Sequence, residues 1–91
     1  MAKTYYTALK VEHKLPHSET VLMAGMLLKV SKWHGNLVRC TELYNDRNLQ
    51  KVGGSTYFFT QDQCRDIMLK PSTDLDFMIN ESINICEATY C

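Results

Sequence analysis

Two runs of roughly alternating apolar and polar residues, residues 26–33 and 37–43, place the strongest constraint on the fold. A period of two is typical of β-strands that bury one face. Gly35 and Asn36 lie between the two runs, and both residue types tolerate the backbone conformations of tight turns. The sequence therefore predicts an antiparallel hairpin.

The length of the turn decides which side chains share a face. A two-residue turn places Lys32 opposite Arg39, and like charges directly across a ladder are unfavourable. We therefore expect a three-residue loop, residues 34–36, which pairs Trp33 with Leu37. In that register the core face holds Leu28, Val30, Val38 and Cys40, and the other face holds Lys29, Ser31, Arg39 and Thr41, with Trp33 and Leu37 at its turn end.

Further segments carry strand and helix signals. Residues 5–13 alternate and predict a strand, whereas residues 18–25 fit a short strand or a single turn. Residues 55–60, "STYFFT", predict another strand. Thr60 and Gln63 form a capping box that opens a short helix, which Pro71 stops.

The last twenty residues fit two structures. Apolar residues from Leu75 to Tyr90 recur at helical spacing, but the same segment also alternates as a hairpin around Asn80 and Glu81. We expect the hairpin, because isoleucine and asparagine are weak helix formers.

Ninety-one residues with 45% hydrophobic and 22% charged side chains fit one folded domain, residues 1–91. The elements above predict a mostly β (α+β) domain, built as a small antiparallel barrel or curled sheet with one or two short helices. A core this small gives only marginal stability. A homo-oligomer would increase that stability and is compatible with the sequence.

The charges are spread unevenly, although the formal net charge is zero. Residues 1–51 contain eight Lys or Arg and four Asp or Glu, a balance of +4, and residues 52–91 contain two and six, a balance of −4. We expect the halves to neutralise each other when they pack; the alternative is that this dipole steers a charged partner.

The sequence offers little for catalysis, metals or membranes. Asp74 and Asp76 fit a helix start or a turn better than acid/base catalysis. Pro16 lies between His13 and His17 and removes the helix that would align them as metal ligands. We therefore expect no enzyme activity, no metal and no cofactor. No stretch has the roughly 18 apolar residues of a membrane span, and the first residues do not resemble a secretion signal.

These absences predict a cytoplasmic protein. Cysteines in that compartment are normally reduced, so we expect free thiols at all four positions. The four are Cys40, Cys64, Cys86 and Cys91.

The segment 24–40 resembles the opening hairpin of small SH3-like barrels and, more loosely, of KOW domains. A glycine precedes one strand, a basic turn with a second glycine follows, and a strand returns; the residues are Gly25, Lys29, Val30, Lys32, Gly35, Val38 and Arg39. KOW-type domains bind RNA or transcription machinery, so the resemblance implies contacts from Lys29, Lys32, Trp33, His34 and Arg39. In size and lack of catalytic motifs the chain is also similar to bacteriophage and mobile-element accessory proteins that bind and block host proteins, which implies the host cytoplasm.

We therefore expect a small non-enzymatic protein-binding module that acts as an inhibitor of a host protein. An aromatic residue beside arginine is typical of binding hot spots, although a lone tryptophan at a strand end also often closes a core. An RNA- or DNA-binding barrel and a cysteine-dependent enzyme are the alternatives. The predicted partner-binding residues are Lys29, Lys32, Trp33, His34, Leu37, Arg39 and Arg47, the last in the turn-rich segment 44–54.

Overall fold

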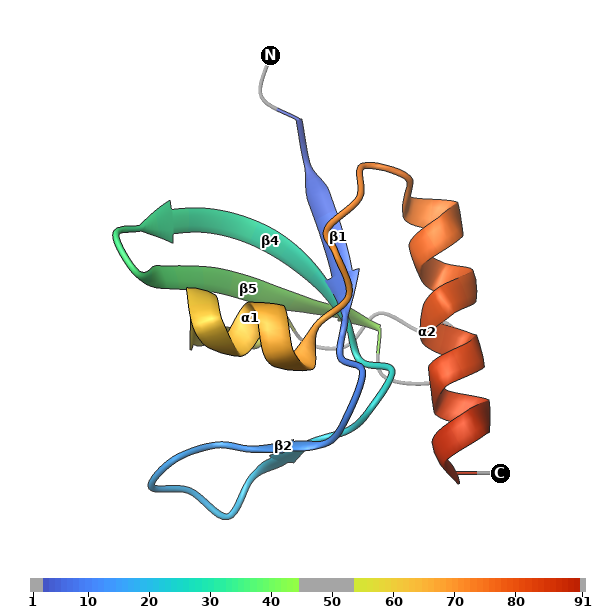
Figure 1. Ribbon diagram of the computed structural model, residues 1–91, viewed down its shortest axis with the longest axis horizontal. Helices are drawn as coiled ribbons and strands as arrows, with labels where there is room; N and C mark the ends of the chain where they lie inside the picture. Colours follow the sequence, from blue (N-terminus) through green and yellow to red (C-terminus); the bar gives the residue numbers. More distant parts are fainter. Residues whose placement is uncertain (1–2, 45–53, 91) are drawn as a thin grey trace.

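The computed structural model describes residues 3–44 and 54–90, without the side chains of residues 32–34 and 44. Figure 1 shows a curved sheet with helices on both of its faces. The strands are β1 (Tyr5–Ala8), β2 (His13–Lys14), β3 (Val21–Leu22), β4 (Leu27–His34), β5 (Leu37–Tyr44) and β6 (Thr56–Thr60), and the helices are α1 (Gln61–Ile67) and α2 (Leu75–Tyr90).

The main sheet is antiparallel, with the strand order β1-β4-β5-β6, and β2 and β3 pair separately as a small hairpin. The α+β class predicted from the sequence is therefore confirmed. In the described part of the chain, β1 and β6 form the two edges of the main sheet and do not pair with each other, so the sheet is open and not a closed barrel.

The register of the β4–β5 hairpin shifts twice, between Leu27 and Leu28 and, nearer the turn, at a β-bulge between Val30 and Lys32. Before the bulge Val30 pairs with Cys40, as predicted. Beyond it the pairs are Lys32–Arg39, Trp33–Val38 and His34–Leu37. The turn therefore contains only Gly35 and Asn36, and the predicted three-residue loop is wrong. The prediction assumed an unbroken ladder, whereas the bulge adds one residue to β4 and moves the pairing by one position.

Strand β1 is shorter than the predicted strand of residues 5–13 and does not have one exposed face. Thr7, Ala8 and Leu9 are all fully buried. The backbone amide of Tyr6 donates to Ser72 (2.8 Å) and its carbonyl accepts from the Ser72 amide (2.9 Å), so the segment after α1 covers the outer edge of β1. Because both faces of this segment are buried, the alternation of apolar and polar residues did not predict where the strand ends.

Helix α1 begins as the sequence predicts. The Thr60 hydroxyl accepts a hydrogen bond from the Gln63 amide (3.1 Å), and the Gln63 side chain accepts one from the Thr60 amide (2.9 Å). These two bonds satisfy backbone donors that an uncapped helix leaves unpaired. Strand β6 therefore passes directly into α1.

The C-terminal segment is a helix, so the predicted terminal hairpin is wrong. The Asp74 carboxylate accepts a hydrogen bond from the Phe77 amide (3.0 Å) at the helix start. Met78 is fully buried against Ala8 and Leu27, with other apolar residues of α2 around them. This packing outweighs the weak intrinsic helix preference of the segment.

The core consists of two clusters on opposite faces of the sheet. The larger cluster joins Leu28, Val38, Cys40 and Phe59 to α1 and to the β2–β3 hairpin. The smaller one lies under α2. The helices thus cover opposite faces, and α2 covers only the part of its face formed by β1 and the beginning of β4.

Gly25, in the loop before β4, lies in close contact with α2. Its φ is +90°, and a Cβ atom at this position would lie 2.8 Å from the Ser82 carbonyl oxygen and 3.1 Å from the Cys86 amide nitrogen. The Ser82 hydroxyl donates a hydrogen bond to the Gly25 carbonyl oxygen. A side chain at residue 25 would separate α2 from the loop before β4.

We predict that Gly25→Ala lowers the free energy of unfolding by about 2–4 kcal/mol, because it combines left-handed backbone strain with overpacking. Gly35→Ala is the matched control, since Gly35 also has a positive φ (+57°) but no atom within 4 Å of its added Cβ. The control should lose only about 1 kcal/mol. Equal losses in urea denaturation would contradict a tight contact at Gly25.

Candidate functional site

The part of the sheet that α2 leaves uncovered forms an open face. It lies on the same side as Tyr6 and Leu43, which pack toward α2, and extends toward the β4–β5 turn and β6. We define the open face as Lys29, Ser31, Leu37, Arg39, Thr41 and Phe58.

The open face is apolar and cationic. Leu37 is 47% exposed and Phe58 is 58% exposed, and Arg39 lies directly across the ladder from Phe58. Lys29 is also exposed. No acidic residue belongs to this face in the part of the chain that the structure describes. Exposed apolar groups beside unpaired positive charge are typical of an interaction surface.

Three of the predicted site residues, Lys29, Leu37 and Arg39, lie together on the open face. The side chains of Lys32, Trp33 and His34, together with Arg47 and residues 45–53, are outside the described residues. Trp33 was assigned to this face because of its expected pairing with Leu37, and the observed pairing with Val38 removes that argument.

Phe58 was missed by the sequence analysis. The adjacent Phe58 and Phe59 in β6 point to opposite faces, as neighbours in a strand must. Phe59 is buried and Phe58 is exposed. The consecutive aromatics in "STYFFT" were therefore an available signal for an exposed ring.

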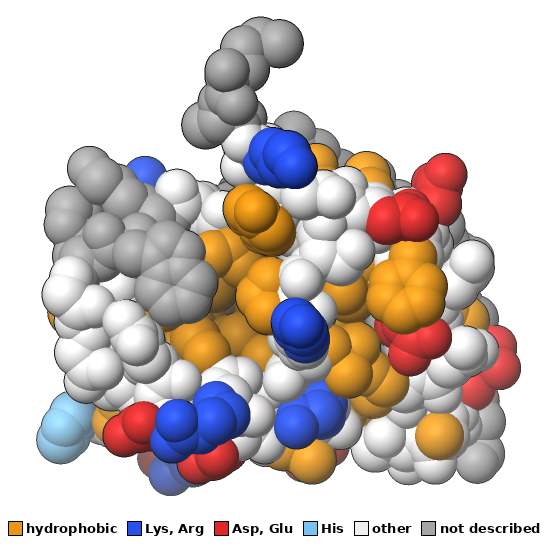
Figure 2. Space-filling view, turned by 45° about the horizontal axis from the view of Figure 1, so that its top comes forward, with side chains coloured by type: hydrophobic (Ala, Val, Ile, Leu, Met, Phe, Trp, Pro, Cys, Tyr) orange, Lys and Arg blue, Asp and Glu red, His pale blue; other side chains and the backbone are white. Residues whose placement is uncertain are grey.

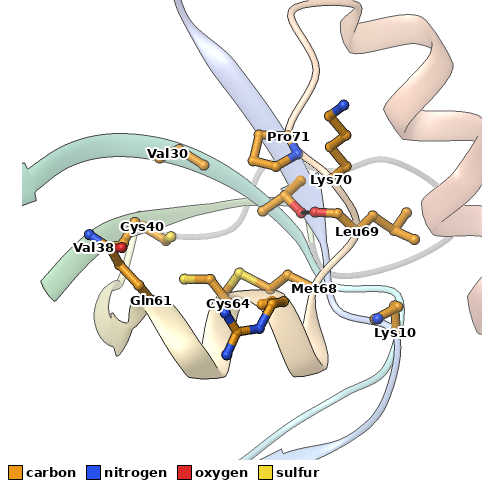
Figure 3. Close-up of a pocket in the computed structure, with 12 residues that line it drawn as sticks. Lys10, Val30, Val38, Cys40, Gln61, Cys64, Met68, Leu69, Lys70 and Pro71 are labelled. Atoms are coloured by element: carbon orange, nitrogen blue, oxygen red, sulfur yellow. Dashed lines mark hydrogen bonds between the residues drawn. The ribbon is translucent and has the colours of Figure 1, made fainter. Parts of the chain in front are cut away.

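A pocket of about 490 Å³ lies on the other face, between α1, the sheet and the segment that follows α1 (Figure 3). Figure 2 shows this side of the molecule, where Lys and Arg side chains lie along part of the margin of an apolar hollow. The pocket is lined by Thr7, Lys10, Val30, Val38, Cys40, Gln61, Cys64, Arg65, Met68, Leu69, Lys70 and Pro71.

The two thiols of the pocket are poor nucleophiles. Burial, reinforced by the neighbouring Cys64, raises the pKa of Cys40 to about 12. Burial also raises the pKa of Cys64. A cysteine nucleophile needs a lowered pKa, because only the thiolate attacks. Both groups are therefore neutral at pH 7, which argues against cysteine-dependent catalysis in this pocket.

No group of three or more His, Cys, Asp or Glu side chains within residues 3–44 and 54–90 is arranged to hold a metal ion. None of the helices found there is long and apolar enough to cross a membrane.

Comparison with known proteins gave no match. No protein-family model, no curated protein and no solved structure is significantly similar to this chain. The open face and the pocket are therefore the features of the described residues that bear on function.

The raised pKa of Cys40 predicts how stability depends on pH. Between about pH 9 and 12 the unfolded chain loses the Cys40 proton while the folded chain keeps it. The free energy of unfolding should therefore fall as the pH rises, by at most about 1.4 kcal/mol per pH unit from this thiol.

Cys40→Ala should flatten this fall, as measured by urea denaturation under reducing conditions from pH 8 to 10. Val38→Ala is the control, because Val38 is also a buried β5 residue but carries no proton to lose. Its slope should equal that of the wild type. Parallel wild-type and Cys40→Ala curves would show that this thiol does not govern the dependence.

Proposed function

We propose that the protein is a small non-enzymatic protein-binding module and that the open face is its docking surface. The observation that carries the proposal is the exposure of Leu37 and Phe58 beside Arg39 and Lys29. Leu37 and Phe58 are diagonal neighbours on adjacent strands, a spacing that aromatic side chains bridge. Together they offer one continuous apolar anchor.

The charges on the open face favour an acidic partner. Arg39 and Lys29 are not balanced by an acid on this face in the described part of the chain. A partner surface with an apolar patch surrounded by Asp and Glu would bury Phe58 and pair with both cations, which increases the association rate and the specificity.

An inhibitory role is part of the proposal. A module of this kind blocks its partner when the surface it covers is one that the partner needs for its own work. We also propose that the β4–β5 hairpin resembles the opening hairpin of SH3-like domains. The sheet that contains it is open and is not closed into a barrel.

The first test is affinity capture from the native cell, or from its host, followed by binding measurements with each purified candidate. We predict that Phe58→Ala weakens binding to the true partner at least tenfold, because truncation of a central aromatic removes more than about 1.4 kcal/mol. Arg39→Ala should weaken it similarly and should reduce its salt dependence.

The matched control is Phe77→Ala, which truncates a phenylalanine of similar exposure (51%) on α2. It should leave both capture and affinity unchanged, and all three variants should melt within a few degrees of the wild type. Equal effects of Phe58→Ala and Phe77→Ala would refute the open face as the docking surface. Capture of RNA, with affinity falling steeply as salt rises, would replace the proposal with nucleic-acid binding.

A further inference from the structure

We infer that the pocket between α1 and the sheet binds an anionic amphiphile, an unbranched aliphatic chain with a single anionic head group. This site lies on the face opposite the open face and is independent of the protein-binding proposal. Its volume of about 490 Å³ is within the range of small-molecule sites.

The interior of the pocket offers a ligand almost no hydrogen bonds. The Thr7 hydroxyl already donates to the Leu69 carbonyl oxygen (2.7 Å), and the Gln61 amide nitrogen already donates to the Gly35 carbonyl oxygen (2.9 Å). The Cys40 and Cys64 thiols are neutral and behave as small apolar groups. With these donors engaged and the thiols neutral, the interior favours an apolar part of a ligand.

The chemical character of the apolar lining favours an aliphatic chain. Val30, Val38, Met68 and Leu69 supply methyl, methylene and thioether surface. None of the described lining residues is aromatic, and the aliphatic and thioether surface that they supply matches an aliphatic chain. Met68 is also flexible and adapts to a ligand of irregular shape.

The margin of the pocket determines the charge of the head group. Lys10, Arg65 and Lys70 reach the pocket from three separate segments, and no acidic residue lines it among those described. The Arg65 guanidinium is engaged by the Asp62 carboxylate at 2.8 Å and lies 4.0 Å from Asp66. Neither Lys10 nor Lys70 forms an ion pair with a described residue.

Lys10 and Lys70 are therefore the residues assigned to the head group. Both are exposed, so an anion can reach them while its chain lies inside the pocket. Hydrogen bonds from an ammonium group to a carboxylate or phosphate are stronger than those between neutral groups. A ligand with both parts gains from the apolar interior and from the cationic margin.

The test is titration of the intact protein with ten-carbon probes below their micelle concentrations, by calorimetry and by NMR of the backbone amides. Decanoate and decyl phosphate test the two sources of the anionic head, decanol lacks the charge, and decylamine reverses it. We expect saturable 1:1 binding of at least one anionic probe, at least tenfold tighter than decanol, and no binding of decylamine. Shifts should centre on Thr7, Met68 and Leu69.

The double variant Lys10→Gln with Lys70→Gln should weaken the binding of the anionic probe at least tenfold and leave the affinity for decanol unchanged. Lys3→Gln with Lys14→Gln is the control, because it removes two exposed lysines that neither line the pocket nor belong to the open face. Equal affinity for decanol and the anions, or shifts centred on α2, would overturn the inference. Failure of all four probes to bind would also overturn it, without affecting the test of the open face.

Discussion

The fold depends on the burial of β1 on both faces and along both edges. One edge of β1 pairs with β4, and the other is bonded to the segment after α1. One face packs under α2 through Ala8, and Thr7 on the other face is also buried, with its hydroxyl donating to the Leu69 carbonyl oxygen (2.7 Å). A four-residue strand is therefore held by α2 on one face and by the segment after α1 along its outer edge.

This arrangement gives the two faces of the sheet different chemistry. On one face, α2 covers only β1 and the beginning of β4, so Leu37, Arg39 and Phe58 remain exposed. On the other face α1 stands away from β1 and β4, and the pocket occupies the space between them. The proposed macromolecular contact and the proposed ligand site are thus consequences of how far each helix extends over the sheet.

Features set by neighbouring residues were predictable from the sequence, and features set by distant contacts were not. The hairpin, the strand 56–60 and the capping box of Thr60 and Gln63 depend on local patterns, and all three are present. Helix α2 depends on contacts with Ala8 and Leu27, some seventy and fifty residues away, which no local preference encodes. The same distinction applies to the sites: Lys29, Leu37 and Arg39 share a face through local register, whereas the pocket joins five separate segments.

The bulge in β4 has a structural consequence beyond the pairing that it alters. A bulge bends its strand and increases the local twist, and Figure 1 shows the β4–β5 arm curving away from the rest of the sheet. The end of the hairpin nevertheless stays attached to the core, because Val38 beyond the bulge is fully buried and the Asn36 carbonyl oxygen accepts a hydrogen bond from the Gln61 amide (3.0 Å). The extra residue therefore displaces one strand of the ladder relative to the other at a point where the inner face of the hairpin is already fastened to α1.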